Sequence, residues 1–236
     1  MLILTNVAKK INDRIILHAI NLTIEPRSIH IFLGSSGVGK STLLRILCGL
    51  ETYDSGTISL DGTQLSPTIA HRKAFGMVFQ HFNLFKHLTV LNNISFPLQK
   101  ILNYSKEAAE KIAYELLRKY GLESHADQSV ADLSGGQKQR LAIGRTLALS
   151  PQIICMDEPT SALDPLLTSY IATTIEALAQ EGYTVIIATH DTFLIEKLNC
   201  IIHLMSQGSI IESASNADYK KHPEQYQKLD AFIRGQ

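Results

Sequence analysis

The stretch IHIFLGSSGVGKST, residues 29–42, joins an apolar run to a glycine-rich turn and then to the start of a helical pattern. Residues 29–33 predict a buried strand, and residues 41–50 predict a helix. The turn between them matches G-x-x-x-x-G-K-[ST], a loop whose backbone N–H groups converge on phosphate oxygens at the N-terminus of a helix. The stretch therefore predicts a phosphate-binding loop in an α/β domain.

The residues of this loop have distinct expected roles. Lys40 is expected to reach the terminal phosphates of a nucleotide, and the Ser41 hydroxyl to ligate Mg²⁺. The residues expected to bind the nucleotide here are Gly34, Ser35, Ser36, Gly37, Val38, Gly39, Lys40, Ser41 and Thr42. The alternative is a glycine-rich turn with an exposed lysine, but the strand before the loop and the helix after it favour the phosphate loop.

Two carboxylates, Asp157 and Glu158, follow the apolar run of residues 153–156. The run predicts a buried strand, and ligands of open α/β sheets bind at the carboxyl ends of the strands. Asp157 is expected to hold Mg²⁺ through water, and Glu158 to orient the water that attacks the γ-phosphate. The alternative is a solvated acidic pair at the end of a strand.

The rest of the sequence predicts a doubly wound α/β core with a helical insertion. Apolar residues alternate as in half-buried strands over residues 2–7, 15–17 and 22–24, and residues 56–60 lie between two turn signals, as in an antiparallel hairpin. Helices are expected over residues 105–120 and 216–236, and another buried strand over residues 185–188.

Composition excludes some classes of partner and site. The 236 residues carry 22 basic and 22 acidic side chains, so net charge favours no binding to nucleic acid or anionic lipid. Cys48, Cys155 and Cys200 are widely spaced in apolar surroundings, which predicts buried free thiols of a reducing cytosol. No apolar run approaches the length of about 18 residues that a membrane span needs. The chain is thus expected to be soluble by itself, and any membrane role needs a spanning partner.

LSGGQ at residues 133–137 completes a series of motifs that resembles the ATP-binding-cassette (ABC) ATPases. The series comprises the phosphate loop, Gln80 after an apolar run, LSGGQ, Asp157-Glu158, residues 161–164 (SALD), and residues 189–191 (THD). The resemblance spans nearly the whole chain. It implies a single domain over residues 1–236, with a P-loop NTPase (RecA-like) core, an antiparallel β subdomain and a helical signature subdomain of about residues 82–146.

The resemblance also implies a homodimer in the ATP-bound state. In such a head-to-tail dimer the signature of one copy caps the ATP held by the phosphate loop of the other, and a serine and glycines at a helix N-terminus suit an anion. The signature residues are Leu133, Ser134, Gly135, Gly136 and Gln137. As an isolated turn they would only cap a helix.

Three further residues take roles from the resemblance. Gln80 is expected to contact Mg²⁺ or the attacking water and to relay its position to a membrane partner, and His190 to contact the γ-phosphate. Asp164 is expected at the dimer seam. Without the resemblance, Gln80 would be interpreted as a surface glutamine and His190 as a histidine with a structural role.

Two positions depart from the family pattern. Ile11 stands where most members have an aromatic residue that stacks on adenine, so plain apolar contact is expected there, with weaker selectivity for adenine. Arg27 stands where glycine is expected, and this change is interpreted as harmless.

Residues 79–90 look like the subunits of bacterial importers for polar amino acids. Phe82, Leu84 and Phe85 suit a docking surface for a coupling helix of a transmembrane permease, although Phe82 and Leu84 equally suit packing inside the helical subdomain. This hypothesis implies permease subunits, a solute-binding protein, and a peripheral location at the cytoplasmic face of the bacterial inner membrane.

Other functions stay open at this stage. An exporter, a lipoprotein-release complex or a cell-division complex would share the catalytic residues and differ in the membrane partner. A soluble relative acting on DNA or ribosomes would usually show coiled-coil insertions or two fused cassettes, which this sequence lacks. An inactive nucleotide-binding scaffold conflicts with the presence of Lys40, Asp157, Glu158 and His190.

Overall fold

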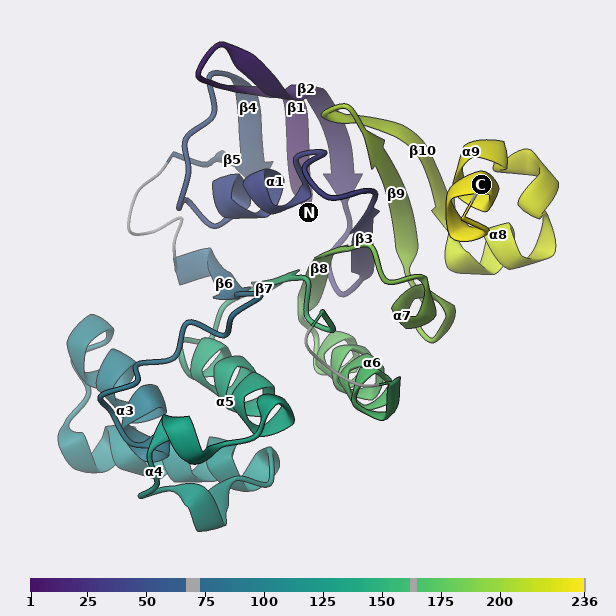
Figure 1. Ribbon diagram of the computed structural model, residues 1–236. Helices are drawn as coiled ribbons and strands as arrows, with labels where there is room; N and C mark the ends of the chain where they lie inside the picture. Colours follow the sequence, from purple (N-terminus) through teal and green to yellow (C-terminus); the bar gives the residue numbers. More distant parts are fainter. Residues whose placement is uncertain (67–72, 162–164, 236) are drawn as a thin grey trace.

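The computed structural model describes residues 1–66, 73–161 and 165–235 and is built around a central sheet with the strand order β10-β9-β3-β8-β7-β6 (Figure 1). Only the pairing of β9 with β10 is antiparallel. The strands are β3 (Ile29–Leu33), β6 (Phe75–Val78), β7 (Ile153–Asp157), β8 (Thr184–Thr189), β9 (Ile201–Ser206) and β10 (Ser209–Ser215). Every residue of β3, β7 and β8 is buried, as their apolar runs predict.

A second sheet, entirely antiparallel, has the order β2-β1-β4-β5. Its strands are β1 (Leu2–Ile11), β2 (Arg14–Ile24), β4 (Ser55–Leu60) and β5 (Thr63–Gln64). The two strands predicted over residues 15–17 and 22–24 are one continuous strand, β2. Their pairing with β1 is irregular, because register shifts fall between Leu4 and Val7 and between Val7 and Lys9. Such bulges interrupt the alternation that sequence patterns detect.

Helices cover both faces of the central sheet (Figure 1). Apolar residues of α1 share a core with β1, β2, β4 and one face of the central sheet, while α6, α7 and α9 pack on the opposite face. The helices of these layers are α1 (Lys40–Leu47), α6 (Pro165–Gln180), α7 (Thr192–Glu196), α8 (Asn216–Lys221) and α9 (Gln227–Ile233). Each helix among residues 1–66, 73–161 and 165–235 is too short or too polar to span a membrane.

A separate group of helices follows β6 and has its own core. It comprises α3 (Val90–Ile101), α4 (Lys106–Lys119), the 3₁₀ helices η1 (Glu123–His125) and η2 (Val130–Asp132), and α5 (Gly135–Ala148). Ser105 caps α4, because its side chain accepts a hydrogen bond from the backbone N–H of Ala108.

The C-terminal segment corrects one prediction. Residues 216–236 were expected to form one helix, but the structure has α8, the 3₁₀ helix η3 (Pro223–Gln225) and α9 in succession. Pro223 has no N–H to donate to a helix, and His222 before it has φ −135° and ψ 57°. The proline therefore ends α8 and forces a new start.

All three cysteines are free and buried, as predicted. Burial raises the pKa of the Cys200 thiol to about 12. Cys48 Sγ lies 3.7 Å from Met77 Sδ. These thiols therefore contribute apolar packing.

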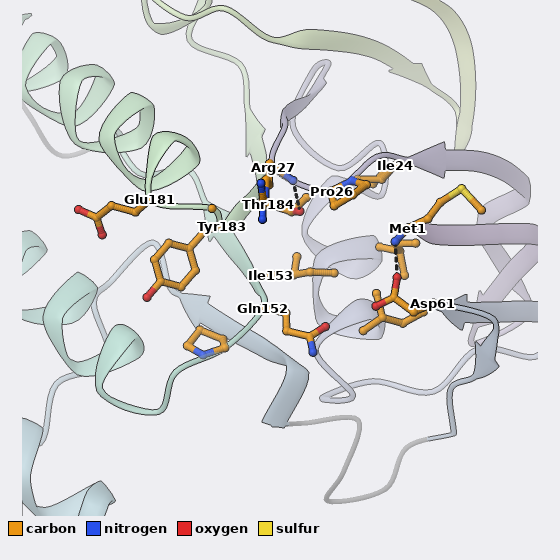
Figure 2. Close-up of a pocket in the computed structure, with 14 residues that line it drawn as sticks. Met1, Ile24, Pro26, Arg27, Asp61, Gln152, Ile153, Glu181, Tyr183 and Thr184 are labelled. Atoms are coloured by element: carbon orange, nitrogen blue, oxygen red, sulfur yellow. Dashed lines mark hydrogen bonds and ion pairs between the residues drawn. The ribbon is translucent and has the colours of Figure 1, made fainter.

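Arg27, at the position where glycine was expected, lies in the turn before β3. Its φ of 59° falls in the left-handed region, which costs a non-glycine residue roughly 1–2 kcal/mol. The Arg27 N–H donates to Thr184 Oγ1 over 3.0 Å, which offsets part of this cost. The turn borders a cavity of about 410 Å³ at the amino ends of β7 and β8 (Figure 2). The lining contains no predicted site residue.

A chain of hydrogen bonds between side chains crosses β3 and β9. Ser28 donates its hydroxyl to Glu25 O, so its oxygen accepts from His30 Nε2 at 3.0 Å. His30 Nδ1 must then accept from His203 Nε2 at 2.9 Å, and His203 Nδ1 accepts from the Ser213 hydroxyl at 2.8 Å. Both imidazoles are therefore neutral. Burial lowers the pKa of His30 to about 4, and burial together with His30 lowers that of His203 to about 3.

This pair predicts a loss of stability in mild acid. In the unfolded chain both histidines have a pKa near 6.5 and bind a proton as the pH falls below it, while the folded chain stays neutral to about pH 4. The free energy of unfolding should thus be highest above about pH 6.5 and fall below it, by at most about 1.4 kcal/mol per pH unit for each histidine. Urea denaturation between pH 4 and 8 measures this slope. A double variant, His30→Leu with His203→Leu, should give a flatter profile, and an equal slope would contradict the assignment.

Candidate functional site

The predicted site residues follow four strands that are neighbours in the sheet. In spatial order, the phosphate loop follows β3, His190 follows β8, Asp157 and Glu158 come at and after the end of β7, and Gln80 comes after β6. These strands are parallel, so their carboxyl ends lie along one edge of the sheet. The fold therefore gathers residues that are far apart in the sequence.

The phosphate loop fits between two other backbone segments. A Cβ on Gly39 would lie 2.8 Å from Ile16 O, and a Cβ on Gly34 would lie 2.5 Å from Met205 O. Gly39 also has a φ of 105°, which only glycine adopts readily. The loop conformation therefore requires glycine at these positions.

The start of α1 suits an anion. Gly39 is its N-cap and supplies no side-chain hydrogen bond, so the first N–H groups of the helix are left for another partner. Lys40 Nζ lies 2.6 Å from Gly34 O and 3.1 Å from Ser35 O, within the loop. Burial lowers the pKa of Lys40, while Glu158 and then Asp157 oppose this effect. A phosphate fits this arrangement of donors.

Ser41 and Asp157 form the second part of the site. The Ser41 hydroxyl donates to Asp157 Oδ1 over 2.6 Å, which joins the first turn of α1 to the end of β7. Burial raises the pKa of Asp157, and the Ser41 hydrogen bond counteracts it. A hydroxyl and a carboxylate are oxygen ligands of the kind that Mg²⁺ prefers together with phosphates and water. This pair therefore fits a magnesium ion.

Glu158 is held by three neighbours. Its Oε2 accepts from the Thr189 hydroxyl over 3.2 Å and lies 3.0 Å from His190 Nδ1, while Oε1 lies 3.7 Å from Lys40 Nζ. Glu158 also has a φ of 47°, and its N–H donates to Ala188 O. Such strain persists only where surrounding contacts fix it, and it is common at functional sites.

Sequence reasoning missed two supporting side chains. Thr189 donates to Glu158 and accepts from the Asp191 N–H over 3.0 Å, and Thr160 donates to Asp191 Oδ2 over 2.7 Å. Asp191 in turn caps α7. The position of Thr189 next to His190 was the only sequence feature that pointed to it. The direction in which the side chain of a threonine at a strand end points depends on the tertiary structure.

Three predicted residues are less closely tied to this cluster. The Gln80 side chain is exposed in the turn after β6. Ile11 ends β1 and is 42% exposed. Asp164 lies outside the described residues.

The signature begins a helix in another part of the molecule. Ser134 is the N-cap of α5, and Figure 1 shows α5 beside α3 and α4 and apart from α1. Leu133 is buried, Gly135 and Gly136 form the first turn, and Gln137 completes a capping box with Ser134. Within one chain, the structure therefore does not bring the signature to the phosphate loop.

An apolar groove of about 800 Å³ lies between β6 and α3. Phe85 lines it and is 38% exposed, whereas Phe82 and Leu84 are half-buried and pack against the core that contains the central sheet. Leu84 also packs against the core that α3, α4 and α5 share, whereas Phe82 packs only against the core that contains the central sheet. Arg145 fixes the turn before Phe85 by donating to Asn83 O and Phe82 O.

Comparison with known families gives one match over most of the chain. The family model described as "ABC transporter" matches residues 17–161. The glutamine transport ATP-binding protein GlnQ of Escherichia coli is 40% identical over 97% of both chains. The glutamate transport ATP-binding protein GluA of Corynebacterium glutamicum is 40% identical over 95% of this chain and 94% of its own.

Solved structures agree with the sequence comparison. A dimeric post-hydrolysis state of the ATP-binding cassette MJ0796 bound to ADP and Pi has a TM-score of 0.81 and 34% identity over 92% of this chain and 99% of its own. CbiO1 of Clostridium perfringens, part of the ABC transporter complex cbiONQ, has a TM-score of 0.84 and 28% identity over 97% of this chain and 94% of its own.

Two glycine variants should separate crowding from backbone strain in the loop. Gly37 and Gly39 both have positive φ, but a Cβ on Gly37 meets nothing within 4 Å. Gly39→Ala should therefore lower the free energy of unfolding by about 1–3 kcal/mol more than Gly37→Ala, because only Gly39→Ala is overpacked. Urea denaturation of both variants measures the difference. Equal losses would show that the contact with Ile16 is not limiting.

Proposed function

Because this chain belongs to the ABC transporter family, we propose that it is the ATP-binding and ATP-hydrolysing subunit of an importer of polar amino acids. The observation that carries this proposal is the convergence of Lys40, Ser41, Asp157, Glu158 and His190 at one edge of the central sheet. The names of the relatives support the class of transported molecule.

Each residue of the cluster has a proposed task. Lys40 exchanges its loop carbonyls for the β- and γ-phosphate oxygens of ATP. Ser41 and Asp157 would hold Mg²⁺, Asp157 partly through water, and Gln80 would contact the same ion or the attacking water. Bound Mg²⁺ would supply neutralisation of the charge on the phosphates. Ile11 offers the adenine an apolar surface without a ring.

Glu158 and His190 are the proposed catalytic pair. Thr189 and His190 fix one carboxylate oxygen of Glu158, and the buried setting limits how far the side chain can turn. Such a carboxylate accepts a hydrogen bond from a water molecule and thereby turns a lone pair of the water oxygen toward the γ-phosphorus. His190 then contacts the γ-phosphate from the end of β8.

We propose that the ATP-bound state is a head-to-tail homodimer. The separation of α5 from α1 within one chain supports this, since the signature needs a second copy to reach a phosphate (Figure 1). Ser134 Oγ accepts from the Gln137 N–H over 3.3 Å, which leaves its own hydrogen for the ATP of the partner. Gly135 and Gly136 add backbone N–H donors, and Asp164 contributes to the seam. The dimeric structure of the ATP-binding cassette MJ0796 is consistent with this assembly.

The proposed division of the chain is one domain over residues 1–236 with a helical subdomain of about residues 82–146. The apolar core that α3, α4 and α5 share supports it. The groove between β6 and α3 is proposed to receive a cytoplasmic segment of a permease subunit. Apolar Phe85 and Ile101 and basic Lys100 and Arg145 favour an occupant with apolar and acidic side chains.

The assembled importer would comprise two copies of this chain, permease subunits and a solute-binding protein, with this chain at the cytoplasmic face of the bacterial inner membrane. Exporters and lipoprotein-release or division complexes use the same kind of ATPase. The identity of the membrane partner therefore distinguishes them from an importer. Purification from native membranes in mild detergent should recover a small permease. Recovery of a protein with a large periplasmic domain, or of no membrane chain, would contradict the importer assignment and leave the ATPase assignment intact.

Glu158→Gln should separate ATP binding from hydrolysis. The amide keeps the shape and the contact with Thr189 but loses the charge that orients water, so hydrolysis should slow by about 10²-fold or more while ATP still binds. An ATP-dependent dimer should then accumulate, as measured by sedimentation with saturating Mg²⁺ and ATP.

Lys40→Ala is the matched control for this variant. It removes the cation that reaches the terminal phosphates, so ATP binding itself should be lost. A Glu158→Gln protein that stays monomeric at saturating ATP would refute the dimer, and one that hydrolyses ATP at the normal rate would refute the role of Glu158.

A further inference from the structure

His125, in η1, touches the signature through one side chain. Its Nε2 lies 2.9 Å from Gln137 Nε2, and its Nδ1 lies 3.1 Å from Ser124 Oγ. Gln137 Oε1 accepts from the Ser134 N–H over 2.7 Å. A short hydrogen-bond chain thus runs from His125 through the Gln137 amide to the backbone of Ser134.

The donors and acceptors of this chain have one consistent assignment. The Ser134 N–H is a donor, so it must face Gln137 Oε1, and the Gln137 NH₂ then faces His125. His125 Nε2 must accept, because two donors cannot share a hydrogen bond. In this assignment the ring hydrogen lies on Nδ1, which donates to Ser124 Oγ.

His125 is itself held on a fixed segment. The carbonyls of Ala126 and Gln128, which follow it, accept from the N–H groups of Leu91 and Val90 at the start of α3. Ala126 and Leu122 on either side are buried in the core shared by the helices. The acceptor offered to Gln137 therefore stands on a rigid base, as an orienting contact requires.

We propose that His125 is a positioning residue of the signature, which orients the Gln137 amide and thereby holds Ser134 where its hydroxyl can reach the ATP of the partner. The inference rests on the proposed function, because it matters only if Ser134 acts across a dimer. Without an acceptor at residue 125, the Gln137 amide loses one of its two anchors. The hydroxyl of Ser134 is then no longer held in one orientation.

Three variants test whether the acceptor itself is what matters. Glutamine can place Oε1 near the position of His125 Nε2, leucine keeps bulk without an acceptor, and lysine brings a donor. All are made in the full chain carrying Glu158→Gln, and the dissociation constant of the ATP-dependent dimer is measured by sedimentation. His125→Leu should weaken the dimer about fivefold at each of its two signatures, about 25-fold in all, and His125→Lys more. His125→Gln should stay within about twofold of the parent.

ATP binding to a single copy serves as the internal control. The helices that carry His125 and the signature lie apart from α1 (Figure 1), so the affinity of the monomer for ATP should be the same in all three variants. If His125→Leu proves unstable in thermal melting, the comparison of lysine with glutamine still decides the question. A dimer as weak in His125→Gln as in His125→Leu, or as strong in His125→Lys as in the parent, would overturn the inference.

Ser134→Ala distinguishes this inference from the function on which it rests. If Ser134→Ala weakens the dimer while the His125 variants do not, the signature acts in the dimer and His125 does not position it. If Ser134→Ala leaves the dimer unchanged, the proposed role of the signature fails, and with it the inference.

Discussion

The hydrogen bond from Ser41 to Asp157 joins the first turn of α1 to the end of β7, and the site depends on it. The two strands that lead to these residues, β3 and β7, are not neighbours, because β8 lies between them. The hydrogen bond crosses β8 at the carboxyl edge of the sheet, because Ser41 lies in the first turn of α1 and Asp157 is the last residue of β7. Thr189 and His190 therefore fall between the loop and Glu158, in reach of the same carboxylate.

The price of this arrangement is buried charge. Lys40 and Asp157 are partly desolvated by burial, which lowers the pKa of Lys40 and raises that of Asp157. Isolated buried charges destabilise a fold, and here each lies near an opposite charge. Glu158 adds strained backbone at the same place. Such features weaken the folded state, and a phosphate and a cation can compensate for them when they bind.

The sequence predicted most of this framework because parallel strands buried on both faces are unmistakably apolar, as in residues 29–33, 153–156 and 185–188. It predicted the order of the site residues for the same reason. The prediction from sequence failed at features that depend on tertiary contacts. The bulges of β2 hid its continuity, and Pro223 divided the final helix. The partners Gln137 of His125 and His30 of His203 belong to other elements of the structure, so their contacts depend on the fold. Phe82 and Phe85 differ in burial although their sequence surroundings are alike.

The position of β3 has a consequence for biosynthesis. Its neighbours in the sheet, β8 and β9, end at Thr189 and Ser206, so the strand that leads into the phosphate loop has no sheet to join until most of the chain has left the ribosome. At roughly 5–20 residues per second, that interval is on the order of ten to thirty seconds. During this time an apolar strand stays exposed in the nascent chain, and chaperones that bind extended apolar segments have their longest opportunity there.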